Sequence, residues 1–262
     1  MSAASMLRAL VERMRQGHRT LVFPDGPAPG LPERFRGAPR VDAGKCPEGC
    51  RSCADACPTE ALLLGEGGPR LDLGRCLFCT DCQRAWPEGA IHFTQDFRLA
   101  TRTREALVVD GRAIELARSL EETSRRLFGR SLKLRQVSAG GCNACEADVN
   151  VLSTVVFDLS RFGIQFVASP RHADGLLVTG PVTEHMRLAL EKTWIAVPAP
   201  KIVIAVGACA ISGGPFAGHP EVEGGAASVV PVDLYVPGCP PHPLTILDGI
   251  LRLLGRIEGV SP

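Results

Sequence analysis

The 262-residue sequence lacks the features that would place it across a membrane or outside the cell. No apolar run approaches the roughly 20 residues that a membrane-spanning helix needs. The N-terminus has no apolar stretch followed by a small-residue cleavage site, so we expect no secretory signal and a reducing cytoplasmic setting. Net charge is absent as a guide too, because 29 basic residues balance 28 acidic ones and indicate no general affinity for nucleic acid.

Residue patterns for substrate chemistry are missing as well. There is no Ser/His/Asp arrangement, phosphate-binding loop or general acid–base pair, and the histidines are scattered. What the sequence has instead is eleven cysteines, seven of them within residues 46–82 and the others at Cys142, Cys145, Cys209 and Cys239. In a reducing compartment, clustered cysteines indicate metal binding rather than disulfides.

The chain divides into four parts by composition. Residues 1–40 carry seven arginines against three acidic residues and predict a basic amphipathic helix at 5–17 followed by an extended arm rich in proline and glycine. That helix fits a membrane surface, a partner or its own protein equally well. Residues 41–97 form a cysteine-dense α+β unit. Residues 98–130 are a basic connector, partly helical after Gly111.

Residues 131–262 have an α/β pattern. Apolar strands are predicted at 132–137, 164–169, 175–180, 201–206 and 233–236, with helices at 147–163, 183–194 and 242–257. Such alternation indicates a mostly parallel sheet covered on both faces. The last four cysteines all follow strand ends, the edge where open α/β sheets build ligand sites. Four thiolates from three loops suit a 4Fe–4S cluster or a tetrahedral zinc.

The motifs "GCNACE", "GACAISGG" and "VPGCPPHPLTILDGIL" resemble the small subunit of energy-converting nickel–iron hydrogenases, which is homologous to the cluster-bearing B subunit of complex I. The resemblance implies a flavodoxin-like domain that holds one 4Fe–4S cluster and passes electrons to or from a large catalytic subunit. It also implies the cluster ligands, which are Cys142, Cys145, Cys209 and Cys239. Complex I proteins carry adjacent cysteines at the first position, so the spacing Cys142-x-x-Cys145 favours the hydrogenase side.

Two acidic residues follow this cysteine pair. Glu146 and Asp148 are candidates for a proton relay toward the partner's active site. The simpler interpretation of each is an acidic side chain favoured by the dipole at a helix N-terminus.

The first N-terminal motif, "CPEGCRSCADACPTEAL", and the second, "CLFCTDCQRAWP", resemble those of two-cluster ferredoxins. In such proteins the fourth cysteine of each motif ligates the other cluster. The likeness therefore implies a 4Fe–4S cluster on Cys57, Cys76, Cys79 and Cys82. The other site would have Cys46, one residue too far out, with Cys50, Cys53 and, as fourth ligand, Trp86. An indole does not ligate iron, so this site is empty, holds a cluster with an incomplete ligand set, or binds another metal such as zinc.

The order of helix, "PERFRG" and cysteine motifs in residues 1–97 resembles the ferredoxin-like subunit of the same membrane complexes, related to the I subunit of complex I. We therefore expect a fusion of two electron-transfer subunits, an α+β ferredoxin-like domain followed by an α/β flavodoxin-like domain. It would be peripheral on the cytoplasmic membrane face, beside a large subunit and membrane subunits, and not catalytic alone. The alternatives are the iron–sulfur subunit of a complex I-like reductase without nickel, and a non-redox zinc-binding module.

Overall fold

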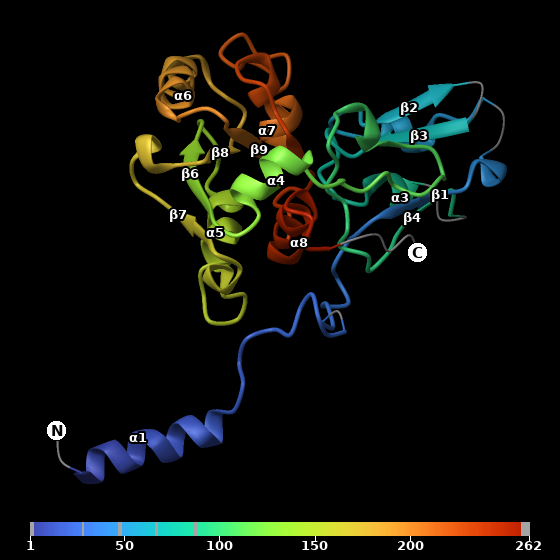
Figure 1. The fold of residues 1–262 in the computed structure, drawn as a ribbon. Coiled ribbons are helices and arrows are strands. Elements are labelled where there is room, and N and C mark those ends of the chain that lie inside the picture. The colour runs from blue at the N-terminus through green and yellow to red at the C-terminus, as the bar shows by residue number, and fades with distance from the viewer. Residues whose placement is uncertain (1–2, 28, 47–48, 66–67, 86–88, 258–262) are drawn as a thin grey trace.

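A five-stranded parallel sheet forms the centre of the C-terminal half (Figure 1). The computed structural model describes residues 3–27, 29–46, 49–65, 68–85 and 89–257. The strand order is β10–β9–β8–β6–β7, and the prediction of a mixed α/β fold with a parallel sheet is confirmed. The strands are β6 Leu132–Ser138, β7 Ile164–Phe166, β8 Gly175–Thr179, β9 Ile202–Val206 and β10 Leu234–Val236.

Helices cover both faces of this sheet. Alternate residues of a strand point to opposite faces, so Leu176 and Val178 pack with α6 and α7, whereas Leu177 packs with α5 and α8. Because every residue of β8 and β9 is buried, these strands read as continuous apolar runs in the sequence. The helices are α5 Ala144–Val151, α6 Glu184–Ala196, α7 Ala208–Ser212 and α8 Pro243–Leu253.

The helix predicted at 147–163 is wrong in its bounds. The helix α5 begins at Ala144 and ends at Val151, and a turn and the 3-10 helix η3 follow it. The β-branched run after Ser153 disfavours a helix. The arm also uses this turn, because the backbone N–H of Leu21 donates to the carbonyl of Val156 at 2.8 Å.

The cysteine-dense unit is built from short elements. An antiparallel pair, β1 and β4, and a three-stranded antiparallel sheet, β2–β3–β5, surround two single-turn helices. The connector contributes β5 to that sheet. The bounds are β1 Pro39–Val41, α2 Ser52–Asp55, β2 Leu62–Gly65, β3 Gly68–Asp72, α3 Asp81–Ala85, β4 Ile91–Phe93, β5 Val108–Val109 and, later in the connector, α4 Glu122–Phe128. Short 3-10 helices are η1 Ala43–Lys45, η2 Glu105–Leu107, η3 Leu159–Phe162, η4 Pro170–His172, η5 Gly214–Phe216 and η6 Ala226–Ser228.

The two halves share one hydrophobic core. Leu71 and Ile91 of the cysteine-dense unit belong to the same buried cluster as Leu176 of the sheet. Hydrogen bonds cross the boundary as well: Thr101 pairs with Tyr235, and the hydroxyl of Ser212 donates to the carbonyl of Gly74 at 2.9 Å. These contacts fix the cysteine loops of one half relative to those of the other.

The N-terminal segment leaves the body and returns to it. The helix α1 (Ala3–Gln16) projects away from the molecule, as Figure 1 shows. The arm then packs back, because Arg161 donates to the carbonyls of Leu21 and Phe23, each at 2.6 Å, and the Phe23 ring meets Phe97 edge to face. None of the helices within the described ranges combines the length and apolar character that a bilayer crossing requires.

Candidate metal centres

The four C-terminal cysteines lie on three loops at one edge of the parallel sheet. Cys142 and Cys145 follow β6, Cys209 follows β9, and Cys239 follows β10. Burial and the negative charges of Cys209, Glu146, Cys239 and Cys142 raise the pKa of the Cys145 thiol. The same causes, led by burial, raise the pKa of Cys209 to about 11. The loops therefore bring all four thiols within range of one another's charge.

Glycines let the backbone come close to two of these sulfur atoms. Gly207 has a φ of +92°, and a Cβ atom there would lie 2.5 Å from the sulfur of Cys145. A Cβ atom on Gly214 would lie 2.9 Å from the sulfur of Cys209. Any other residue at these positions would push into the thiols, so the glycines keep the space around them open.

Glu146 is fixed behind Cys145 by two hydroxyl groups. Its side chain is 6% exposed, and Oε1 accepts hydrogen bonds from Ser138 and Thr179, each at 2.6 Å. Burial opposes ionisation of this carboxyl, but the two hydroxyl donors and a backbone N–H outweigh burial and lower its pKa. The carboxylate thus links α5 to the ends of β6 and β8.

Ser138 and Thr179 were missed by sequence reasoning. A signal was present, because each residue ends a buried strand just before a glycine-containing loop. Burial raises the pKa of Asp148, the second acidic candidate. A proton-relay role for Glu146 or Asp148 stays a prediction.

A second group of four cysteines gathers in the N-terminal half. Cys76 and Cys82 are buried, and Cys57 and Cys79 are partly buried. Burial, together with the charges of Cys57, Cys79 and Cys53, raises the pKa of Cys82 to about 11, although a backbone N–H opposes this rise. Cys57 of the first motif therefore lies among the three cysteines of the second.

Backbone N–H groups point at two sulfurs of this second group. Phe78 donates to the sulfur of Cys76 at 3.3 Å, and Ala61 donates to the sulfur of Cys57 at 3.2 Å. Such hydrogen bonds favour negative charge on sulfur and tune a bound redox centre.

The remaining three cysteines, Cys46, Cys50 and Cys53, also lie near one another. Burial and then the charge of Cys46 raise the pKa of Cys53, and Cys50 contributes in the same direction. Trp86, the residue at the expected fourth position, lies outside the described residues. The state of this third site therefore stays a prediction.

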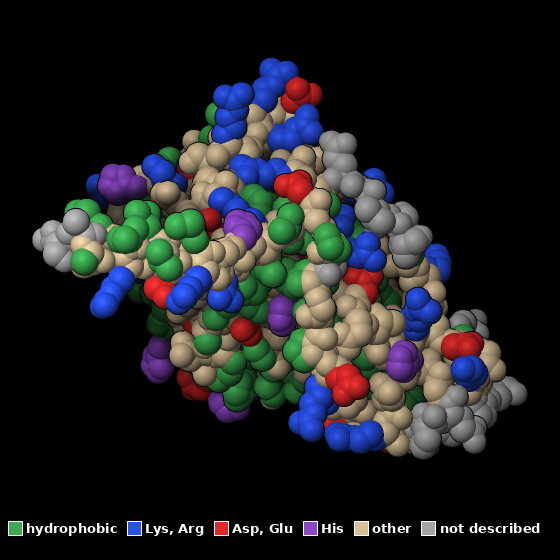
Figure 2. Space-filling view, turned by 90° about the horizontal axis from the view of Figure 1, so that it is seen from below, with side chains coloured by type: hydrophobic (Ala, Val, Ile, Leu, Met, Phe, Trp, Pro, Cys, Tyr) green, Lys and Arg blue, Asp and Glu red, His purple; other side chains and the backbone are tan. Residues whose placement is uncertain are grey.

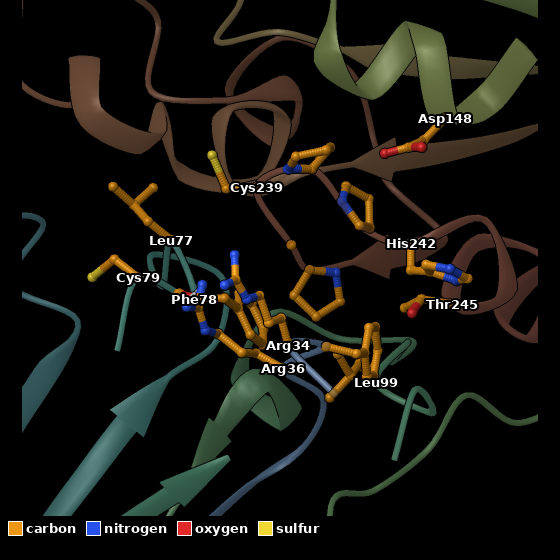
Figure 3. Close-up of a pocket in the computed structure, with 15 residues that line it drawn as sticks. Arg34, Arg36, Leu77, Phe78, Cys79, Leu99, Asp148, Cys239, His242 and Thr245 are labelled. Carbon is orange, nitrogen blue, oxygen red and sulfur yellow. Dashed lines mark hydrogen bonds between the residues drawn. The ribbon is translucent and has the colours of Figure 1, made fainter. Parts of the chain in front are cut away.

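A cavity of about 300 Å³ lies between the two complete sets. Its lining includes Cys79 from the N-terminal set and Cys239 from the C-terminal set, on facing loops (Figure 3). Burial, then Cys142, then Cys79 raise the pKa of Cys239, so the charges of the two sets reach each other across this gap. Arg34 and Arg36 of the arm line the same cavity.

The donor atoms of both complete sets fit an iron–sulfur group. Each set has four thiols, partly or fully sheltered except for Cys142 and Cys239, and thiolates are the ligands that 4Fe–4S clusters use. In the described part of the chain, no group of three or more His, Cys, Asp or Glu side chains is placed to hold a single metal ion.

A parallel α/β sheet with cysteine-bearing loops at one edge places the chain among redox proteins of the α/β class. The family model described as "NADH ubiquinone oxidoreductase, 20 Kd subunit" matches residues 142–253. Formate hydrogenlyase subunit 7 of Escherichia coli (strain K12) is 42% identical over 160 residues, which are 61% of this chain and 63% of that protein. The probable membrane-bound hydrogenase subunit mbhJ of Pyrococcus furiosus is 43% identical over 136 residues, 50% of this chain and 79% of that protein.

The NADH-quinone oxidoreductase of Heliobacterium modesticaldum also has a similar protein, its B subunit, which is 41% identical over 121 residues, 46% of this chain and 69% of that protein. The chain belongs to the family of the 20 kDa subunit of NADH–ubiquinone oxidoreductase. The predicted membership of a hydrogenase and complex I-like oxidoreductase family is confirmed. The chain spans less than two thirds of the formate hydrogenlyase subunit.

Proposed function

We propose that the chain is an electron-transfer subunit with two 4Fe–4S clusters. The first would be held by Cys57, Cys76, Cys79 and Cys82, and the second by Cys142, Cys145, Cys209 and Cys239. The observation that carries this proposal is the cavity whose facing loops bear Cys79 and Cys239. When bound, each cluster supplies one-electron redox chemistry, so that electrons pass between the two sets and a catalytic partner.

The chain's own residues adjust these centres. Buried walls and backbone N–H groups set the charge that each set of sulfurs tolerates. The hydrogen-bonded Glu146 adds fixed negative charge behind Cys145. Neither set includes a group for substrate chemistry, and catalysis is assigned to a large subunit on another chain.

The domain assignment is part of the proposal. Residues 41–97 form a ferredoxin-like domain and residues 131–262 a flavodoxin-like domain, joined in one chain by fusion. The crossed placement of Cys57 among the cysteines of the second motif supports the ferredoxin-like part. The third site, on Cys46, Cys50 and Cys53, is assigned no cluster because Trp86 stands where the fourth ligand is expected.

We place the chain on a membrane surface, next to the membrane subunits of its complex. The names of the hydrogenase relatives include a membrane-bound complex. The helix α1 supports this placement, because Met6, Leu7, Leu10 and Met14 are exposed on it next to arginines and stand clear of the body (Figure 2).

The test is metal analysis of the complex that co-purifies with this chain from its native host without oxygen. About eight irons per chain, the sum of two four-iron clusters, together with nickel, would support a hydrogenase-type large subunit. Iron without nickel would favour the complex I-like reductase, to which the NADH-quinone oxidoreductase relatives point. A colourless chain that holds zinc and no iron would overturn the proposal in favour of a zinc-binding module.

A further inference from the structure

The arm segment 34–36 lies where the two complete cysteine sets face each other. The guanidinium of Arg36 donates through Nη1 to the carbonyl of Phe78 at 3.3 Å, and Phe78 directly precedes Cys79. The ring of Phe35 meets the His242 ring edge to face, with centroids 5.4 Å apart. Figure 3 shows both arginines beside Phe78 in the cavity. One short segment therefore touches both cysteine loops.

The segment itself is held firmly. Gly37 donates its N–H to the carbonyl of Thr94, and Ala38 donates to that of Asp96, each at 2.7 Å. A Cβ atom on Gly37 would lie 2.0 Å from the carbonyl oxygen of Asp96, so the two backbones are in close contact. The side chain of Gln95 also donates to arm carbonyls, including that of Phe35 at 3.2 Å. The arm is thus anchored to the chain just after β4.

The contact on the other side is equally fixed. His242 caps α8, because its Nδ1 accepts the N–H of Leu244 at 3.1 Å, and this places the ring three residues after Cys239. A ring that packs on His242 therefore reports the position of the Cys239 loop.

We propose that residues 34–36 of the arm form a positioning element between the two electron-transfer sets. Phe35 and Arg36 hold the Cys239 loop and the Cys79 loop at a fixed separation, and the guanidiniums of Arg34 and Arg36 place positive charge in the gap. This inference rests on the proposed function. It assigns a role to a proline-rich segment that the cysteine motifs leave unexplained.

The charge and the contacts have separable effects. One-electron reduction adds negative charge to a centre, and a nearby cation favours that state and raises the midpoint potential. Loss of the Arg36 hydrogen bond or of the Phe35 ring loosens the spacing without the same effect on charge. Arg34 lines the cavity but donates no hydrogen bond among the described residues, so Arg34→Met removes charge alone.

The experiment uses the full chain with its clusters, reduced stepwise and followed by electron paramagnetic resonance. Four variants are compared with the wild type: Arg36→Met, Arg36→Lys, Arg34→Met and Phe35→Leu. The readouts are the two midpoint potentials and the magnetic interaction between the two reduced centres, which weakens as their separation grows or becomes variable.

We expect Arg36→Met to lower the midpoint potential of the cluster nearest Cys79 and to weaken the magnetic interaction. Arg34→Met should lower the potential and leave the interaction unchanged, whereas Phe35→Leu and Arg36→Lys should weaken the interaction and leave the potential nearly unchanged. If Arg36→Met and Phe35→Leu both keep wild-type potentials and interaction, the positioning element is refuted. If the wild type itself shows no 4Fe–4S signals, the proposed function fails instead.

Discussion

The two cysteine sets are built on different kinds of scaffold. In the C-terminal half the cysteine loops extend from buried parallel strands, and β9 and β10 end only a few residues before Cys209 and Cys239. In the N-terminal half the cysteines lie between helices of four and five residues and strands of three to five residues. The difference teaches that the first scaffold exists before any metal binds, whereas the second depends on what its thiols hold.

The buried cysteines support the same contrast. Cys53, Cys76 and Cys82 are part of the shared hydrophobic cluster of the N-terminal half, beside Leu71 and Phe78. Of the C-terminal cysteines, Cys142 and Cys239 are exposed at the sheet edge. Thiols are thus core material in one half and edge material in the other.

The largest expected effect comes from withholding iron. Full-length chain prepared without iron should lose amide protection across residues 49–85, because the short elements there have few contacts besides the thiols. Amides of β8 and β9 should keep their slow exchange, since those strands are fully buried. Hydrogen–deuterium exchange measures both regions in one sample. Equal loss of protection in both halves would contradict the contrast between the scaffolds.

The next effect separates the complete N-terminal set from the incomplete one. Cys57→Ser should lower the iron content by about four atoms per chain, because it removes a ligand of a complete set. Cys46→Ser is the matched control, and it should leave iron unchanged, since its site has Trp86 in place of a fourth cysteine. Iron analysis of both variants gives the answer, and a loss of about four irons from the control would show that the third site is filled.

A Trp86→Cys variant sharpens the same point from the other direction. It restores a fourth thiol to the set of Cys46, Cys50 and Cys53. A gain of about four irons per chain on reconstitution would establish that the tryptophan removed a ligand. Iron equal to that of the wild type would mean that the extra residue between Cys46 and Cys50 already prevents assembly.

Sequence patterns predicted the sheet well because burial on both faces leaves a continuous apolar record, as in β8 and β9. They failed for the helix after Cys145, because hydrogen bonds from the distant arm decide the fate of residues 152–157. Cysteine spacing pointed to the grouping of each set. It was silent on Ser138, Thr179 and Arg36, whose importance depends on which strands and loops become neighbours in space.

The ion pair at the joint of the two halves should have a moderate effect. Arg104 donates to both carboxylate oxygens of Asp72, at 2.7 and 2.6 Å, and the Asp72 side chain is 8% exposed. Arg104→Met leaves that carboxylate buried and unpaired, which should lower the free energy of unfolding by about 3 kcal/mol. Urea denaturation measures the change.

The control for this pair is Arg112→Met, which removes an arginine that is exposed beside Asp110. Water screens such a pair, so this variant should unfold at the wild-type urea concentration. If both variants lose the same stability, burial is not what makes the Asp72 pair matter.

The smallest effect on either half should follow deletion of residues 1–16. The described side chains of α1 are exposed, and contacts such as the ion pair Arg15–Glu12 and the hydrogen bond from Arg13 to Gly17 stay within the helix and the residue next to it. The unfolding midpoint and the iron content should therefore match those of the full chain. Binding to vesicles that contain anionic lipid should fall, because the exposed apolar face and arginines are lost together. A matched variant, Leu7→Ser with Leu10→Ser, keeps every charge and should lose binding nearly as far, since burial of apolar side chains supplies most of the affinity; full binding by that variant would leave the arginines as the cause.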